Sequence, residues 1–383
     1  MAEHRLDAYI VPSSDPHQSE YPPEHWKHRA WISGFEGSAG TVVVTSTRAG
    51  LWTDFRYFLE AEDALAGSGI ELYKMGEPEV PDYPEWLAAE LAADMRVGFD
   101  ALSFSLSAAR NLEKRLVTRG IAVVPGDDLV GAIRDDRPPL PGRPVFVHDV
   151  KYAGESRGEK ISALRSTLEK MHADYHVIST LDDIAWLLNI RGSDVAYNPV
   201  VVAHLLLGRE TVRLYIDEKQ LPPDVRSELE SDGVTVRPYG EAASDLASIE
   251  DGSAVVVSPE QISVGLVEQL GDGVRRIEHV NLSTEAKAKK NAVELDHLRD
   301  VMVRDGIAMA RFLHWVSSSV EEGGVTELDA EEKLREFRSR GERFVSESFR
   351  TISGYRGHGA IVHYSATEES SSTLEPAGLY LVD

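Results

Sequence analysis

Short runs of apolar and β-branched residues alternate with stretches of helical periodicity over the first 283 residues. The runs that predict strands are Leu6–Val11, Thr41–Thr45, Leu51–Asp54, Ala173–Ile178, Pro199–Ala203 and Arg213–Asp217. The stretches that predict helices between them include Tyr57–Ala66, Pro84–Ala93 and Gly158–His172. Strands that alternate with helices in this way indicate an α/β layer fold.

The order of features in the first part of the chain recurs in the second. In each part an apolar strand precedes an Ala-Trp segment, at Ala30–Trp31 and Ala185–Trp186, and two further strands follow. One repeat at the length of a domain predicts a duplicated α/β unit and not a solenoid. Two unrelated α/β domains that share this arrangement are the alternative.

Two breaks in the pattern predict three domains. The segment Asp135–Pro144 holds four prolines, which cannot continue a helix or a central strand, so it is interpreted as a linker. The second break lies at Asn281–Thr284, before a long helical pattern. We therefore expect α/β domains at residues 1–140 and 145–283, and a third domain at 284–383.

The third domain is expected to begin with a helix of about seven turns, capped by Ser283 or Thr284 and ending before Gly323-Gly324. Its predicted buried face is Leu295, Leu298, Met302, Gly306, Met309, Leu313 and Val316. Thr326 and Asp329 predict a capping box for a second helix, whose inner face holds Leu328, Leu334 and Phe337. Two strands are expected next, at Ala360–His363 and Leu379–Val382, and because the sequence stops within the latter we expect it to be truncated.

Composition narrows the classes of function. Hydrophobic residues make up 42% and charged residues 27%, as in globular proteins. Lys and Arg number 40 against 64 Asp and Glu, and a net charge of −24 disfavours nucleic-acid partners. The absence of cysteine excludes disulfides and a cysteine nucleophile and is compatible with the cytoplasm. No run is long enough to span a membrane and no signal peptide is visible, so we expect a cytoplasmic protein without a membrane partner.

Few residues point to chemistry by pattern alone. The glycine-rich stretch Gly34–Gly40 leads into a strand and carries no lysine, so we expect a structural turn there and not a phosphate-binding loop. His25 and His28 are expected to be a solvated surface pair. His363, at the end of an apolar strand, is either a structural histidine or a residue projecting into a cleft. Asp383 is either a metal ligand or the solvated first residue of a turn.

Several segments in order carry a family resemblance. They are Ile32–Thr41, Leu51–Phe58, Asp183–Val195, Asn198–Val200, Lys290–Leu295 and Gly359–Tyr364. On these residues the chain resembles the cytosolic, three-domain Xaa-Pro aminopeptidases (aminopeptidase P) of the pita-bread metallopeptidase family. The resemblance implies two related creatinase-N-like α/β domains, followed by the N-terminal part of a pita-bread α+β catalytic domain.

The resemblance also implies an activity and a site. Family members release the N-terminal residue from peptides with proline at the second position, using two divalent metals, usually Mn²⁺, held by two Asp, one His and two Glu. The first metal-ligand Asp corresponds to Asp383, and the catalytic imidazole beside the metals corresponds to His363. Family members are often homodimers.

The other four expected ligands have no counterpart among these 383 residues. The chain alone is therefore expected to be inactive, to bind Mn²⁺ weakly and to hold its last domain loosely. The alternative function is a non-catalytic scaffold that binds peptides or partners on creatinase-like domains.

Overall fold

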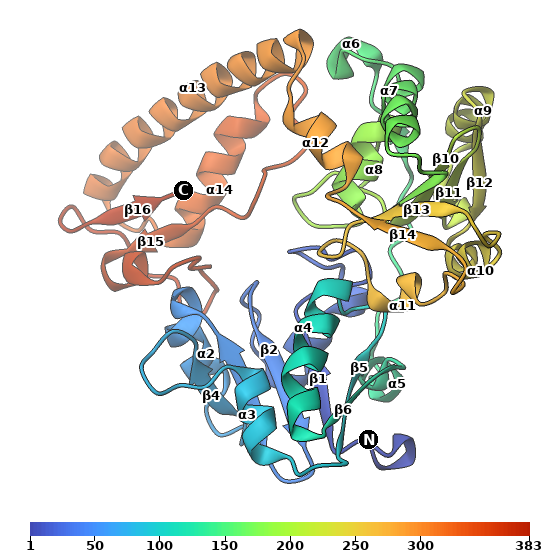
Figure 1. Ribbon diagram of the computed structural model, residues 1–383. Helices are drawn as coiled ribbons and strands as arrows, with labels where there is room; N and C mark the ends of the chain where they lie inside the picture. Colours follow the sequence, from blue (N-terminus) through green and yellow to red (C-terminus); the bar gives the residue numbers. More distant parts are fainter. The chain divides into compact units, whose positions relative to one another are not determined.

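The computed structural model describes residues 1–383 (Figure 1). The chain forms two compact units. The first contains Met1–Phe55 and Ala61–Lys290, and the second contains Asn291–Asp383 together with the short segment Arg56–Glu60. No helix is both long and apolar enough to cross a membrane.

The first six-stranded sheet belongs to the N-terminal part of the first unit. Its strands are β1 (Ala8–Val11), β2 (Thr41–Thr45), β3 (Ala49–Thr53), β4 (Glu71–Lys74), β5 (Arg96–Asp100) and β6 (Ala122–Gly126). Their order in space is β4-β3-β2-β1-β5-β6. Strand β2 runs antiparallel to both β1 and β3, whereas the pairs β3–β4, β1–β5 and β5–β6 are parallel.

The second sheet repeats this arrangement strand for strand. It contains β8 (Tyr175–Ile178), β10 (Ala203–Gly208), β11 (Val212–Ile216), β12 (Val234–Pro238), β13 (Ala254–Val257) and β14 (Arg275–Glu278), in the order β12-β11-β10-β8-β13-β14. Strand β10 is antiparallel to both neighbours and the other three pairs are parallel, as in the first sheet. The predicted duplication is confirmed, because order and strand direction both match.

Helices alternate with the strands of both sheets, which confirms the α/β prediction. The first part contains α1 (His28–Ser33), α2 (Phe58–Ala64), α3 (Tyr83–Glu90), α4 (Leu106–Leu116) and α5 (Leu129–Ile133). The second contains α6 (Val150–Ala153), α7 (Arg157–Lys170), α8 (Leu181–Leu188), α9 (Pro223–Ser231), α10 (Ala242–Ala247), α11 (Val264–Val267) and α12 (Leu282–Ala288). A short ladder joins β7 (Phe146–Val147) to β9 (Ile190–Arg191).

Of three details around these sheets, one differs from the sequence pattern and two agree with it. The run Pro199–Ala203 is not a strand, because β10 begins only at Ala203; the preceding valines are buried but lie outside the ladder. Residues 137–145 have no regular structure, as the prolines predicted. Gly34 ends α1 in the left-handed region (φ 74°), which confirms a structural turn there.

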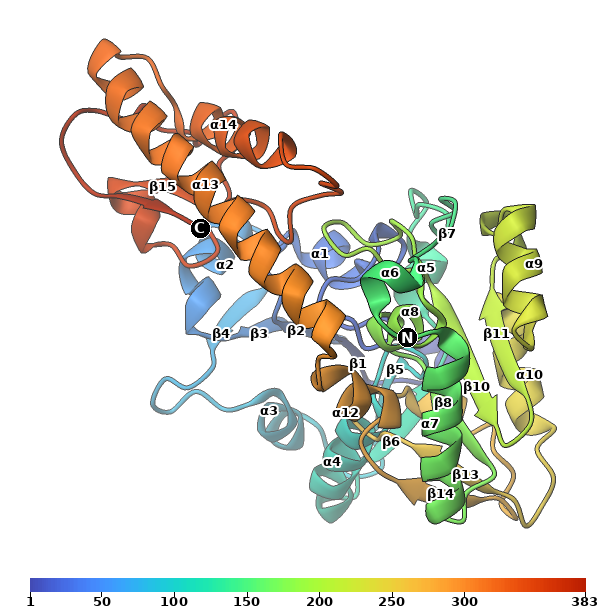
Figure 2. The ribbon, with the colours of Figure 1, turned by 90° about the horizontal axis from the view of Figure 1, so that it is seen from above.

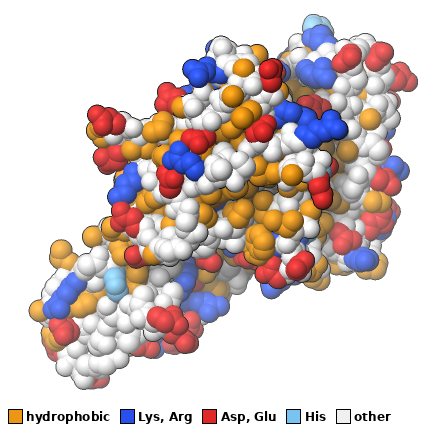
Figure 3. Space-filling model, turned by 90° about the horizontal axis from the view of Figure 1, so that it is seen from below, with side chains coloured by type: hydrophobic (Ala, Val, Ile, Leu, Met, Phe, Trp, Pro, Cys, Tyr) orange, Lys and Arg blue, Asp and Glu red, His pale blue; other side chains and the backbone are white.

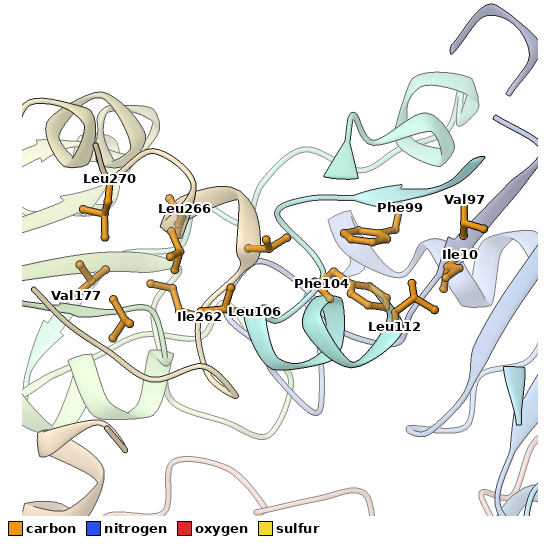
Figure 4. Packing of buried hydrophobic residues seen from close by; sticks show 14 of the residues in the cluster. Ile10, Val97, Phe99, Phe104, Leu106, Leu112, Val177, Ile262, Leu266 and Leu270 are labelled. Carbon is orange, nitrogen blue, oxygen red and sulfur yellow. The ribbon is translucent and has the colours of Figure 1, made fainter. Parts of the chain in front are cut away.

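A shared apolar core joins the two repeats (Figure 4). Leu106 of α4 lies near Leu266 of α11 and near Ile262, which precedes that helix. The two segments exchange backbone hydrogen bonds from Leu106 N to Ile262 O (3.0 Å) and from Val264 N to Phe104 O (2.9 Å). Gly265 approaches Ala101 so closely that an added Cβ would lie 3.0 Å from its backbone. The two repeats therefore pack as one body and not as beads on a linker.

The same interface has a polar part. His17 is buried, its Nδ1 donates to the Ser179 carbonyl (2.9 Å), and its ring stacks on His204 at 4.5 Å. The Tyr239 hydroxyl donates to His17 Nε2 at 3.0 Å. Burial lowers the pKa of both histidines, which favours their neutral forms.

The second unit is built on two long helices that lie side by side in Figures 1 and 2, α13 (Ala292–Glu322) and α14 (Glu327–Ser339). The ribbon of β15 (Ser353–Tyr355) and β16 (Tyr380–Val382) is antiparallel, and η7 (Arg356–Ala360) follows β15 as a 3₁₀ helix. Phe312 and Leu334, both fully buried, centre a small core that also includes Val316, Val325, Ala330, Tyr355 and Leu374.

The long helix was predicted, but its cap was not, and of its predicted buried face only Val316 is buried and Met309 partly buried. Asn291, and not Ser283 or Thr284, caps α13 through a capping box with Glu294; the two predicted residues belong to the separate helix α12. Its buried residues are Ala308, Phe312 and Val316, spaced four apart. Leu295, Met302 and Leu313 of the expected stripe are 39%, 68% and 49% exposed. The prediction assumed one partner along the whole helix, whereas the small core involves only its second half.

The second helix begins as expected, with a capping box between Thr326 and Asp329. The strand expected at Ala360–His363 is wrong: η7 ends at Ala360 and a turn follows it. Arg356 and His363 both have positive φ, 51° and 58°, which an extended strand cannot accommodate. The strand expected at Leu379–Val382 is present as β16.

Candidate functional site

Asp383 lies directly after β16, where the ribbon fixes its backbone. Its amide donates to the Ile352 carbonyl and its carbonyl accepts from the Ile352 amide, both at 3.0 Å. Asp383 itself is exposed. The carboxylate is therefore presented to solvent at the end of a paired strand, as either of its two interpretations requires.

His363 is exposed in a turn of the same unit. Its backbone is held at φ 58°, in the left-handed region that non-glycine residues seldom occupy. Its ring stacks on Tyr57, from the segment that belongs to this unit, at 5.6 Å between centroids. No hydrogen bond or ion pair joins His363 to Asp383.

The metal expectation can be tested on the donor set. No group of three or more His, Asp or Glu side chains in the chain is arranged to hold a metal ion. Asp383 supplies one carboxylate, whereas a tight site needs several converging ligands. The residues present therefore do not by themselves form a two-metal centre.

A buried cluster that the sequence analysis missed lies in the same unit. Glu327 has no exposed surface, and its carboxylate accepts hydrogen bonds from the backbone amides of Tyr355 (2.6 Å) and Ser372 (2.8 Å). His358 Nδ1 lies 2.9 and 3.0 Å from its two oxygens, and the Tyr364 hydroxyl donates at 3.1 Å. A charged residue among the first residues of a helix is usually solvated, so nothing in the sequence distinguished Glu327 from its exposed neighbours.

The interpretation of His25 and His28 as a solvated pair is wrong. His28 is 5% exposed and its Nε2 lies 3.0 Å from Asp128, which also pairs with Arg137 at 3.0 Å. His25 Nδ1 donates to the Pro138 carbonyl at 2.6 Å. Although burial works in the opposite direction, the hydrogen bonds from His28 and the Gly131 amide lower the pKa of Asp128. His25 contacts the proline-rich linker directly, and His28 is connected to it through Asp128, which pairs with Arg137. A three-residue spacing cannot reveal these long-range contacts.

One face of the molecule shows how the charged side chains are distributed. On the face in Figure 3, acidic, basic and apolar side chains are interspersed and no continuous basic area is visible.

Three family models match the chain in succession. Residues 1–135 and 136–294 each match a creatinase/prolidase N-terminal domain, and residues 296–383 match metallopeptidase family M24. The two N-terminal matches fall on the two topologically identical sheets.

Similar proteins match along the whole chain. It is 37% identical to aminopeptidase P2 of Arabidopsis thaliana, over 99% of this chain and 58% of that protein, and 37% identical to a probable Xaa-Pro aminopeptidase P of Ajellomyces capsulatus, over 100% and 64%. The solved X-prolyl aminopeptidase of Caenorhabditis elegans, described as a cytosolic enzyme with a di-nuclear active site, superposes with a TM-score of 0.93 at 33% identity. That match covers 99% of this chain and 63% of the other.

The chain thus spans about three fifths of the length of these relatives. Its own three segments match in the order that the sequence pattern predicted, with the duplicated α/β units first. The chain is therefore similar over its whole length to Xaa-Pro aminopeptidases, and it matches, in order, two creatinase/prolidase N-terminal domains and a segment of metallopeptidase family M24.

Proposed function

We propose that the protein to which these 383 residues belong is a metal-dependent aminopeptidase that releases the N-terminal residue from peptides with proline at the second position. The observation that supports this most strongly is the similarity over the whole chain to an X-prolyl aminopeptidase of known structure, with a TM-score of 0.93. The domains are taken as 1–140, 145–283 and 284–383. Localisation in the cytoplasm and assembly as a homodimer belong to the same proposal.

His363 and Asp383 are the residues that this chain contributes to the site. Asp383 provides a carboxylate for one of two divalent ions, with Mn²⁺ suited to oxygen ligands. The exposed imidazole of His363 donates to the substrate or to the tetrahedral intermediate. Both belong to the second unit, in which Asp383 stands on a paired strand and His363 on a turn with positive φ.

Proline in the substrate explains why such an enzyme is selective. The scissile bond before proline lacks an N–H, and the ring restricts φ. A site for ordinary peptides would use that N–H as a donor, so a proline substrate needs a dedicated pocket.

The chain alone should not carry the activity. Isothermal titration of the 383-residue chain with Mn²⁺ is expected to show no micromolar binding, because no cluster of ligands is present, and a fluorogenic Xaa-Pro substrate should not be cleaved. Two-site micromolar binding or measurable turnover would show that the assignment of His363 and Asp383 is wrong.

A non-catalytic scaffold is the second candidate, because two creatinase/prolidase N-terminal domains make up most of the chain. The gene sequence after the codon for Asp383 separates the two. A further Asp, a His and two Glu in family order would support the peptidase, whereas a stop codon would support the scaffold.

A further inference from the structure

Glu327 occupies an unusual position at the start of α14. It is the first residue after the N-cap Thr326, so its carboxylate lies at the positive end of the helix dipole. Its backbone also takes part in the same network: its amide donates to the Ser372 carbonyl (3.0 Å), and its carbonyl accepts from the Ser353 hydroxyl (2.8 Å). One residue thus binds both ends of the segment 353–372.

The carboxylate completes this attachment. Its four donors are two backbone amides, a phenol and an imidazole, from Tyr355, Ser372, Tyr364 and His358. A buried carboxylate without such partners would be strongly destabilising. The segment therefore cannot rearrange without leaving Glu327 unsatisfied, which selects one conformation of the chain around it.

That conformation includes His363. Tyr364, the next residue, donates its hydroxyl to Glu327 and stacks on His358, with ring centroids 4.5 Å apart. A left-handed backbone at a non-glycine residue costs energy and persists only where its surroundings enforce it. The bonds to Glu327 immediately after His363, and those to His358 five residues before it, are such surroundings.

Glu327 also selects one tautomer of His358. A carboxylate can only accept, so Nδ1 of His358 carries the proton and Nε2 is left with its lone pair when the ring is neutral. The side chain of His358 is partly exposed, at 27%.

We infer that Glu327 is a positioning residue: through Tyr364 and His358 it fixes the turn that presents His363. The inference rests on the proposed function only for the role of His363. The hydrogen-bond network itself can be tested without any activity.

The test uses Glu327→Gln, Tyr364→Phe and a matched control, Glu332→Gln, in the 383-residue chain. Glu332 is on the same helix, its side chain is 72% exposed, and its one ion pair, with Arg335, is 3.4 Å long. Gln at 327 directs an amide donor at groups that are themselves donors. Amide hydrogen exchange at Tyr355 and Ser372 should accelerate at least tenfold in Glu327→Gln, and no more than twofold in the control.

Two NMR signatures separate positioning from general stability. The ring ¹⁵N shifts of His358 should lose the pure Nδ1–H pattern in Glu327→Gln. Tyr364→Phe removes a single hydroxyl, so it should fold, and it should shift the backbone and ring resonances of His363 while exchange at Tyr355 stays within threefold. Unchanged His363 resonances in Tyr364→Phe, or unchanged exchange in Glu327→Gln, would overturn the inference.

In the complete protein the same variants should lower kcat at least tenfold with KM within threefold, because they move a catalytic group without touching the substrate. If the wild type does not cleave Xaa-Pro peptides, the proposed function fails while the NMR results still decide the network. If the wild type is active and Tyr364→Phe keeps full kcat, the link from Glu327 to His363 is refuted.

Discussion

A single buried carboxylate, Asp183, attaches the last helix of the first unit. It has no exposed surface and accepts from the hydroxyls of Thr180 (2.7 Å) and Thr284 (2.6 Å), while Lys287 Nζ lies 2.9 Å from its Oδ1. Thr284 and Lys287 belong to α12, and Asp183 to α8. Asp183, which begins one of the segments that carry the family resemblance, therefore also holds α12 against α8.

Replacing Asp183 by Asn should lower the free energy of unfolding by about 3 kcal/mol, because a buried charge pair loses one partner. Asp182→Asn is the matched control: it contacts the same lysine, but its side chain is 58% exposed, and the loss should stay below about 1 kcal/mol. Urea unfolding of both variants measures the difference. Equal losses of stability in the two variants would mean that Asp183 does not hold α12 in place.

His176 predicts how stability depends on pH. It is fully buried in β8; Nδ1 donates to the Val256 carbonyl (3.1 Å) and Nε2 accepts from the Leu282 amide (3.3 Å). Burial lowers its pKa to about 4, although the Val256 carbonyl and Asp183 act in the opposite direction and His279 reinforces the lowering. Below pH 6.5 His176 binds a proton in the unfolded chain but not in the folded protein. The free energy of unfolding therefore falls as the pH falls from 6.5 toward 4.

The variant His176→Gln should remove up to about 3 kcal/mol of the change in stability between pH 7 and pH 4. The exposed His172→Gln should leave the dependence unchanged. Unfolding by urea at half-unit pH steps gives the slopes. A wild-type slope retained in His176→Gln would show that this histidine is not buried in its neutral form.

At the scale of single elements, local sequence patterns predicted which helices and strands form better than they predicted which segments pack against them. Strand β2, helix α7 and the capping box at Thr326 lay where apolar periodicity and capping residues placed them, because local sequence determines these features. The buried face of α13 and the turn at His363 depend on which segment packs against them. Local sequence does not indicate how far the small core extends along α13, nor that the carboxylate of Glu327 accepts a hydrogen bond from Tyr364.

Helix α13 offers a direct contrast between the expected and observed faces. Phe312 is fully buried, so Phe312→Ala should cost about 3–5 kcal/mol. Met302, in the predicted stripe, is 68% exposed, and Met302→Ala should cost less than about 0.5 kcal/mol. Thermal and urea unfolding of the second unit measure both. A larger loss of stability in Met302→Ala than in Phe312→Ala would support the buried face that the sequence predicted.

For the whole molecule, the sequence predicted the duplication, but it did not predict the interface between the two copies. Two similar orders of strands and tryptophans predicted two α/β units, and the two sheets share one topology. The contact between α4 and α11 joins residues that are far apart in sequence. No single-sequence pattern marks such a pairing. His363 and Asp383 as site residues came from family resemblance, and the structure places them in one unit without a ligand cluster.

The interface between the two α/β repeats can be weakened by substituting one glycine, Gly265. Gly265→Val should destabilise the first unit by about 2 kcal/mol, because its Cβ meets the Ala101 backbone at 3.0 Å. Gly240→Val, where no atom lies within 4 Å of an added Cβ, should cost clearly less. Amide exchange should become faster on both sides of the interface, near Leu106 and Ile262, only in the first variant. Equal effects at the two glycines would argue against a shared core.

The central proposal is that this chain is part of an Xaa-Pro aminopeptidase, and one assay tests that proposal most directly. The complete protein, loaded with Mn²⁺, is given two peptides that differ only in proline or alanine at the second position, and the released N-terminal residue is quantified. The account predicts release from the proline peptide, at least a hundredfold preference over the alanine peptide, loss of activity with a chelator, and at least a hundredfold lower kcat in His363→Ala. Metal-independent release, equal rates on both peptides, or full activity in His363→Ala would contradict it.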